Sequence, residues 1–156
     1  MDCKELTTGT TLYLPVFVPG ALFSVGDGHG AQGDGEVDGA AVETGMDRLE
    51  LTLTACKGLA IERPRAENGA HLMFLAFDED LDEAALVATR DAMIWLRDAR
   101  RLSWDDAYNL ASLALDLRIS QVVDGLKGVH AMLPKRVFVD GPTSFASGRA
   151  EPGRRP

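Results

Sequence analysis

The fold is decided by the segment His71-Leu72-Met73-Phe74-Leu75-Ala76-Phe77. Apart from its first residue this segment is wholly apolar, and a short run of this composition predicts a strand that is buried on both faces. Such a strand needs other elements to cover it, so the rest of the chain is interpreted outward from it.

Downstream of this strand the pattern changes to that of two helices. An apolar stripe at three- and four-residue steps predicts a helix from about Asp82 to Arg101. Ser103 followed by Asp106 resembles a capping box and predicts the start of a second helix after a gap of only a couple of residues. We therefore expect a tight helical hairpin or a sharp corner. The expected inward positions are Ala85, Ala88, Ala92, Trp95, Leu96 and Ala99 in the first helix, and Ala107, Leu110, Ala111, Ala114 and Leu117 in the second.

Two short strands follow the helices, at residues 119–123 and 129–133, and the turn-like pair Asp124-Gly125 separates them. The last residues, 142–156, consist largely of Ser, Gly, Arg and Pro, and we expect them to form a disordered tail. Residues 1–141 are expected to form a single domain.

Upstream of the buried strand the signals are β in character. Residues 6–19 predict a strand, and Pro15 predicts that it is an edge strand or ends in a bulge. Residues 21–25 predict a second short strand. Residues 49–54 alternate Leu with polar residues, which is the pattern of a strand with one wet face, and residues 57–63 extend it or pair with it. The expected class is α+β: a mainly β fold with a mixed or antiparallel, sandwich-like sheet, and a helical pair near the C-terminal part.

Composition limits the classes of function. The chain has 156 residues, and 16 Lys and Arg residues against 24 Asp and Glu residues give a net charge of −8. This balance argues against non-specific binding to nucleic acid or to an anionic membrane. No run approaches the roughly 18 apolar residues of a membrane span, and the N-terminus lacks the features of a signal peptide. Cys3 and Cys56 fit no metal or redox spacing. We expect reduced thiols and a cytoplasmic protein.

The unusual segment is residues 26–36, Gly-Asp-Gly-His-Gly-Ala-Gln-Gly-Asp-Gly-Glu. Its glycines allow the backbone to fold closely around a small ligand. In an extended segment residues two apart point the same way, so Asp27 can converge with His29, and Asp34 with Glu36. One imidazole with carboxylates suits zinc or another divalent metal, and Glu36 could serve as general base or proton shuttle. The alternative is a tight loop whose Asp side chains cap turns.

Other motifs are weaker. Residues 28–33 match G-x-G-x-x-G, but no helix pattern follows them and the nearby carboxylates would repel a pyrophosphate. An EF-hand fails because His29 stands where Asp or Asn is needed. His130 lies on a mainly apolar strand, where a hydrogen-bonded structural histidine is the first interpretation and a role in a site is the second. His71 is interpreted as a surface or capping residue.

Three blocks of the sequence resemble the acetamidase/formamidase family. Residues 15–36, Pro-Val-Phe-Val-Pro-Gly-Ala-Leu-Phe-Ser-Val followed by the glycine-rich segment, look like the signature of that family. Residues 106–123 are similar to a second block, and residues 127–135, Lys-Gly-Val-His-Ala-Met-Leu-Pro-Lys, to a third. The resemblance covers residues 6–138.

The resemblance implies an enzyme that hydrolyses short linear amides such as formamide and acetamide to ammonia and the carboxylic acid. It also implies a mainly β fold with helices, a divalent metal, and assembly into oligomers. Zinc is the expected metal, with calcium as the alternative. Carried over position by position, Asp27 and His29 become candidate metal ligands and Glu36 the candidate acid/base. Asp34 is a candidate ligand or support for the ligands, and His130 a candidate support.

Length is the departure from the family pattern. Family members are about twice as long, and this chain resembles their C-terminal half; an upstream His-Gly-Gly-Asn element normally leads into the segment found here at residues 1–6. Three hypotheses follow. The chain is the C-terminal portion of a metal-dependent amidase acting on a small amide. Alternatively, it is a non-catalytic fragment or subunit that needs a partner for the N-terminal half. The third hypothesis is an acidic metal-binding module.

Overall fold

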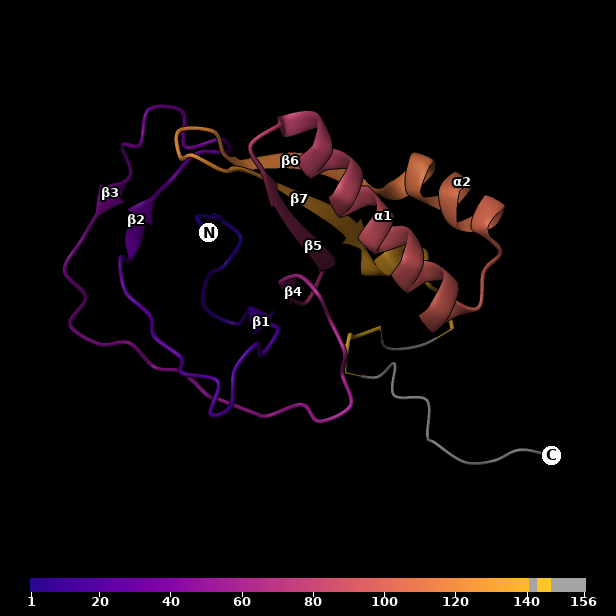
Figure 1. Cartoon of the computed structure of the whole chain (residues 1–156), viewed down its shortest axis with the longest axis horizontal. Coiled ribbons are helices and arrows are strands. Elements are labelled where there is room, and N and C mark those ends of the chain that lie inside the picture. The colour runs from indigo at the N-terminus through magenta and orange to yellow at the C-terminus, as the bar shows by residue number, and fades with distance from the viewer. Residues whose placement is uncertain (141–142, 147–156) are drawn as a thin grey trace.

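The structure is a computed structural model that describes residues 1–140 and 143–146. Five strands form one sheet in the order β1-β4-β5-β7-β6, and two more form a separate small sheet, β2-β3 (Figure 1). Every pair of neighbouring strands is antiparallel. The elements are β1 (Thr11–Tyr13), β2 (His29–Ala31), β3 (Val42–Glu43), β4 (Arg65–Glu67), β5 (His71–Asp78), α1 (Leu81–Arg100), α2 (Trp104–Ala114), β6 (Asp116–Gln121), β7 (Lys127–Pro134) and the 3-10 helix η1 (Lys135–Val137). The predicted α+β, mainly β class with a helical pair is confirmed.

The strand predicted at residues 71–77 is β5, at the centre of the large sheet, and its residues alternate between two buried faces. Leu72 and Phe74 pack in the larger hydrophobic core, which also contains residues of both helices. Met73 and Leu75 pack in a smaller core on the other face, together with Cys3. The prediction of a strand buried on both faces is therefore confirmed.

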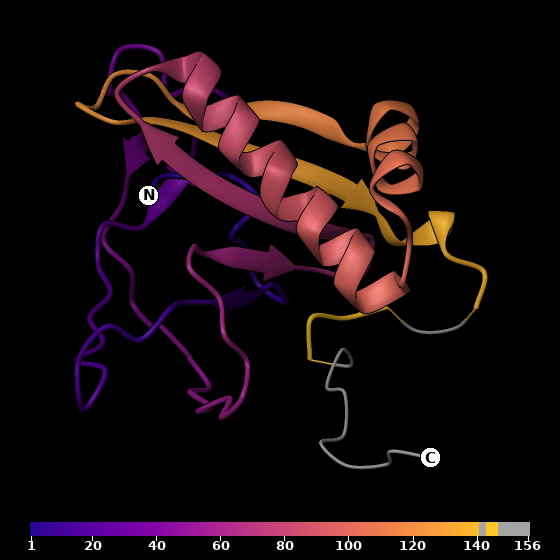
Figure 2. The ribbon, with the colours of Figure 1, turned by 45° about the vertical axis from the view of Figure 1, so that its right-hand side comes forward.

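Both helices form as predicted and lie on one face of the sheet, with α1 running obliquely across the strands (Figure 2). Asp80 caps α1, where its side chain accepts from the backbone N–H groups of Asp82 and Glu83. Ser103 caps α2, where its Oγ accepts from Asp106 N at 3.0 Å. Arg101, between the helices, adopts a left-handed conformation (φ 57°) that reverses the chain. The described part of the chain contains no helix long and apolar enough to cross a bilayer.

An aromatic cluster closes the larger core. Phe145 lies 5.2 Å from Phe74 and 5.7 Å from Trp95, measured between ring centroids. It is only 2% exposed, so the core includes part of the segment that the sequence assigned to a tail. The rest of that tail, and residues 141–142, lie outside the described residues.

Several strand boundaries differ from the prediction. The second helix ends at Ala114, and Leu117 belongs to β6 and is half exposed instead of facing the core. Strand β6 begins three residues before the predicted 119–123. Its pairing with β7 and the bend at Asp124 and Gly125 agree with the expected hairpin.

Most of the strand predictions for the segment upstream of β5 are wrong. Within residues 6–19 only β1 is a strand, and it lies at the edge of the sheet. Pro15 has no N–H to donate to a neighbouring strand, so it does not extend β1. Residues 21–25 have no regular structure, and Ala21 and Leu22 have positive φ. Residues 49–54 form no strand, residues 57–58 form a turn and residues 62–63 a bend, whereas β4 follows Pro64. Figure 1 shows this region largely as irregular chain beside the sheet.

Leu49, Leu51 and Leu53 show why alternation misled the prediction. Their exposed fractions are 56%, 50% and 69%. An alternating segment becomes a strand only when a neighbour takes its backbone hydrogen bonds and a second layer covers its apolar face. Neither is present for these residues in the part of the chain that the structure describes.

Candidate functional site

The glycine-rich segment is fastened to the edge strand β6. Gly35 N donates to Ile119 O at 2.8 Å, and Val122 N donates to Gly35 O at the same distance. Gly35 has φ +93°, a conformation that glycine adopts without a steric penalty. This turn places the segment next to the first residues of the chain, whose Asp2 N donates to Gln121 Oε1 at 2.8 Å.

The turn at Gly35 separates two carboxylates that were expected to converge. Asp34 joins Glu5 and His130, whereas Glu36 joins Asp2 and Asp124. The expectation assumed an extended backbone, but Gly35 and Glu36 both have positive φ, so the alternation of side chains does not apply. Asp27 and His29 do converge, and Glu43 is the third member of their group. In each of the three groups the potential ligand atoms lie within 4.8 Å of one another.

The Asp27–His29–Glu43 group is built on the β2–β3 hairpin. The register places His29 opposite Glu43, and Asp27 Oδ2 lies 3.4 Å from His29 Nε2. Gln32 Nε2 donates to Ser120 O, so Gln32 Oε1 faces His29 Nδ1 at 3.1 Å and accepts a hydrogen bond from its N–H. A neutral His29 then has its lone pair on Nε2, the atom that faces Asp27. The hydrogen bond to Gln32 raises the pKa of His29; burial opposes this and Asp27 adds to it.

Glu36 is the buried carboxylate of the second group. It is 8% exposed, and its Oε2 has no hydrogen-bond partner among the described residues. Burial raises the pKa of Glu36, and the negative charges of Asp2 and Asp124 add to this effect while His29 opposes it. A carboxyl group with a raised pKa can both take up and release a proton closer to neutral pH.

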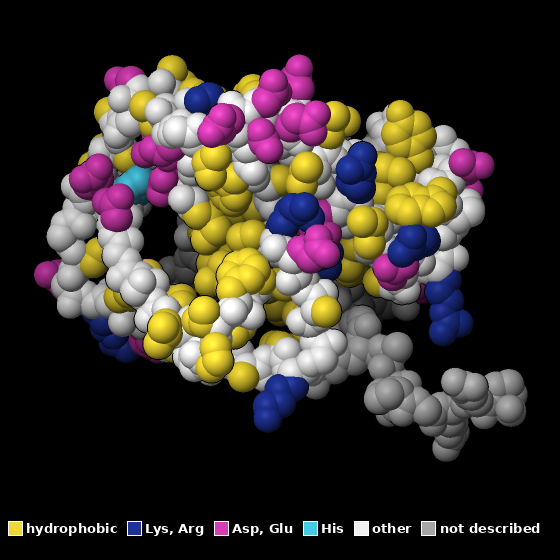
Figure 3. Space-filling model, viewed as in Figure 1, with side chains coloured by type: hydrophobic (Ala, Val, Ile, Leu, Met, Phe, Trp, Pro, Cys, Tyr) yellow, Lys and Arg dark blue, Asp and Glu magenta, His cyan; other side chains and the backbone are white. Residues whose placement is uncertain are grey.

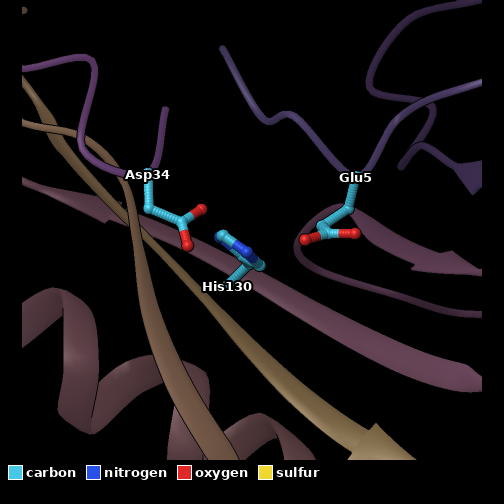
Figure 4. A group of neighbouring side chains, drawn as sticks. All are labelled: Glu5, Asp34 and His130. Atoms are coloured by element: carbon cyan, nitrogen blue, oxygen red, sulfur yellow. The ribbon is translucent and has the colours of Figure 1, made fainter. Parts of the chain in front are cut away.

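His130 is the fully buried imidazole of the third group (Figure 4). It lies on β7 opposite Arg118 of β6, on the sheet face away from the helices. The β6–β7 register shifts between Ile119 and Gln121, and the intervening Ser120 places its Oγ 2.8 Å from His130 Nδ1. Burial lowers the pKa of His130, which favours the neutral ring.

Four buried side-chain polar atoms lack a hydrogen-bond partner among the described residues. Three of them belong to these groups: His29 Nε2, Glu36 Oε2 and His130 Nε2. An unpaired buried polar atom is costly and calls for a missing partner. Two groups offer an imidazole with two carboxylates, which fits zinc, and the third offers only carboxylates, which fits calcium better. The donor sets therefore fit a divalent cation.

Asp2, Glu5, Glu43, Ser120 and Asp124 were absent from the predicted site. No spacing in the sequence identifies them, because each reaches its group through strand pairing or through the packing of the N-terminal segment. Figure 3 shows the setting on one face, where Asp and Glu side chains gather along the upper and left-hand edges and hydrophobic side chains in the middle. His71 belongs to none of the three groups.

The acetamidase/formamidase family model matches residues 1–140. The chain is 51% identical to an acetamidase of Mycolicibacterium smegmatis over 37 residues, which is 24% of this chain and 9% of that protein.

Two solved structures resemble most of the chain. The first is a predicted acetamidase/formamidase from Thermoanaerobacter tengcongensis, with a TM-score of 0.79 and 32% identity over 88% of this chain and 45% of the other. The second is an acetamidase from Bacillus halodurans, with a TM-score of 0.73 and 34% identity over 87% of this chain and 46% of the other. The chain thus spans less than half the length of these solved relatives.

Proposed function

The chain belongs to the acetamidase/formamidase family, and on that premise we propose that it forms part of a metal-dependent amidase acting on short linear amides. Formamide and acetamide are the proposed substrates, and ammonia and a carboxylic acid are the products. The observation that carries the metal dependence is the position of His29 Nε2, a buried atom with no hydrogen bond that meets the geometric criteria, 3.4 Å from Asp27 Oδ2 and grouped with Glu43.

Asp27, His29 and Glu43 would hold the metal, with Gln32 fixing the orientation of the imidazole. Zinc is the proposed ion; when bound it would polarise the amide carbonyl and lower the pKa of a bound water. A cytoplasmic location is part of the proposal, supported by the two free cysteine thiols.

Glu36 is the proposed acid/base. It would take a proton from the attacking water and give it to the amide nitrogen. The water oxygen bonds to the carbonyl carbon, the carbon–nitrogen bond breaks, and the proton leaves with ammonia. Its burial and raised pKa support this assignment, because a carboxyl group with a higher pKa than usual holds and releases a proton more readily than an ordinary glutamate does.

Two alternatives to an active amidase are each supported by a specific observation. The chain spans less than half of its solved relatives, which supports a subunit or fragment whose site is completed by another chain. The Asp2–Glu36–Asp124 group has only oxygen ligands, which supports a metal-binding module for calcium.

The test is ammonia release from formamide and acetamide by the purified, zinc-loaded chain. We expect Glu36→Gln to lower the rate by about a hundredfold or more. Glu50→Gln is the matched control, because the Glu50 side chain is 75% exposed and belongs to none of the groups, so its rate should equal that of the parent chain. Circular dichroism confirms that each variant is folded.

Equal activity in Glu36→Gln would rule out the proposed role of Glu36. No ammonia from a folded, metal-loaded parent chain would rule out activity of the isolated chain and favour the subunit alternative. Calcium binding in place of zinc, with no dependence on His29, would favour the metal-binding module.

A further inference from the structure

We infer that Glu5, Asp34 and His130 form a second divalent-cation site, separate from the Asp27–His29–Glu43 group and built into the sheet face away from the helices. The inference goes beyond the proposed amidase function. The ligand it takes is a borderline transition metal such as zinc or cobalt(II), because one imidazole and two carboxylates supply the donors.

The first support is the position of the imidazole. His130 is 0% exposed, and its Nε2 has no hydrogen-bond partner among the described residues. Figure 4 shows the ring lying between the carboxylates of Asp34 and Glu5, which reach it from separate segments of the chain. All three ligand atoms lie within 4.8 Å of one another, so side-chain rotations would bring each of them to the roughly 2 Å at which zinc binds nitrogen and oxygen.

The second support is the hydrogen bond that holds the other ring nitrogen. Ser120 Oγ lies 2.8 Å from His130 Nδ1, and Ser120 is itself 1% exposed. When the hydroxyl accepts from Nδ1–H, the lone pair lies on Nε2 and points toward the carboxylates. A hydrogen bond on the far nitrogen is the usual way in which proteins orient a metal-binding histidine.

Two cations beside the group explain how its carboxylates stay together without a metal. Lys4 Nζ lies 3.2 Å from Glu5 Oε1 and 3.6 Å from Asp34 Oδ2. Arg118 NH1 lies 3.2 Å and 3.8 Å from the same two oxygens. Each carboxylate has a second oxygen for a ligand, and Lys4, one third exposed, has room to move away. Lys4 would therefore compete with the metal, and its removal should tighten metal binding.

The probe is cobalt(II) alone, added to the full chain and followed by its visible absorption and by equilibrium dialysis. The His29→Gln background removes the imidazole of the other group. We expect that background to bind one cobalt with the intense absorption of a four-coordinate site. Adding Asp34→Asn should weaken the binding by at least about tenfold, and adding Lys4→Met should tighten it. His71→Gln is the matched control and should leave cobalt binding unchanged, because His71 is in none of the groups.

His130→Gln tests the imidazole directly, but a buried substitution can unfold the chain. Asp34→Asn is therefore the main test, because the Asp34 side chain is 38% exposed and its substitution should leave the chain folded. Thermal unfolding of the variant confirms that it is folded. The inference is overturned if the His29→Gln chain binds no cobalt, or if Asp34→Asn leaves its affinity and spectrum unchanged. The readout is metal binding and not ammonia, so this site and the proposed amidase activity can fail independently.

Discussion

Ser120 links the two histidines that lie in the acidic groups. The Ser120 hydroxyl contacts His130 Nδ1, and the Ser120 carbonyl accepts a hydrogen bond from Gln32 Nε2. The Oε1 atom of the same Gln32 side chain faces His29 Nδ1. Both imidazoles are therefore held by Nδ1, and among the described residues Nε2 of His130 has no hydrogen-bond partner while Nε2 of His29 lies 3.4 Å from Asp27 Oδ2. A single residue in a bulge of β6 thus orients both candidate ligands.

Tyr13 provides a pH prediction at the residue scale. Its hydroxyl donates to Glu67 Oε1 at 2.5 Å, and burial, followed by this hydrogen bond, raises the pKa of Tyr13 from 10.0 to about 12. A pKa that is higher in the folded state gives a contribution to stability that is complete below pH 10 and is lost as the pH rises toward 12. Between pH 9 and pH 11, the free energy of unfolding of Tyr13→Phe should therefore decrease less than that of the parent chain.

The measurement is urea unfolding at several pH values in that window. Tyr108→Phe is the control, because Tyr108 is 63% exposed and its substitution should leave the pH dependence unchanged. Parallel stability curves for Tyr13→Phe and the parent chain would contradict the prediction.

Two features at the scale of the elements position the site: the β5–β7 pair and the contact of α1 with β4. Strand β7 pairs with β5 along its whole length and carries His130 at its centre. Helix α1 packs on the opposite face and is tied to β4 by a buried ion pair, Arg65 with Asp91. Loosening either contact should therefore disturb the sheet that carries the site.

Gly128 tests the packing of β7. A Cβ at this position would lie 2.9 Å from both Gln121 Cγ and Phe77 Cε1, closer than side-chain contacts allow. We expect Gly128→Ala to lower the free energy of unfolding by about 1–3 kcal/mol, because the neighbours must shift. Gly125→Ala, in the preceding turn, meets nothing within 4 Å and should change stability by less than about 0.5 kcal/mol.

Urea unfolding of the two glycine variants against the parent chain measures this difference. Equal stability of Gly128→Ala and Gly125→Ala would show that Gln121 and Phe77 move aside at no cost.

Asp91 tests the attachment of α1 to the sheet. Arg65 Nε donates to Asp91 Oδ2 at 3.0 Å, and its NH2 donates to Asp91 Oδ1 at 2.5 Å. Both side chains are 11% exposed, so Asp91→Ala would leave a largely buried, uncompensated charge. We expect a loss of about 3 kcal/mol or more in the free energy of unfolding.

Asp98→Ala is the matched control on the same helix, because its pair with Arg97 is exposed at the surface (57% for Asp98). It should cost less than about 1 kcal/mol by thermal or urea unfolding. A similar cost for the two variants would mean that the Arg65–Asp91 pair does not hold the helix to the sheet.

At the scale of the whole molecule the N-terminal region exposes much apolar surface. Among residues 14–53, Phe17 is 81% exposed, Leu22 79%, Leu53 69% and Val16 68%. Large exposed apolar patches mark surfaces that contact another chain. Association of two copies of the chain through these side chains would bury part of this surface.

We predict that the purified chain associates, as measured by sedimentation velocity over a range of concentrations. The double variant Phe17→Ser with Leu22→Ser should shift the distribution toward monomer. Leu113→Ser is the control, because Leu113 is 85% exposed but lies on α2, away from this region. A parent chain that is monomeric at every concentration would contradict the prediction.

The sequence alone predicted the parts that depend on local geometry. The apolar run of β5, the stripe of α1 and the Ser103 cap follow from backbone periodicity and from hydrogen bonds within a few residues. Asp27 and His29 also lie together as predicted, but Asp27 has a positive φ, so their contact does not arise from the extended backbone that the prediction assumed.

Tertiary structure decided the rest. It divided Asp34 from Glu36 at the Gly35 turn and brought Glu5, Glu43 and Asp124 to the groups. It also left the alternating Leu49–Leu53 segment unpaired. Strand register and burial depend on which distant segment supplies a partner, and periodicity within one segment carries no information about that partner.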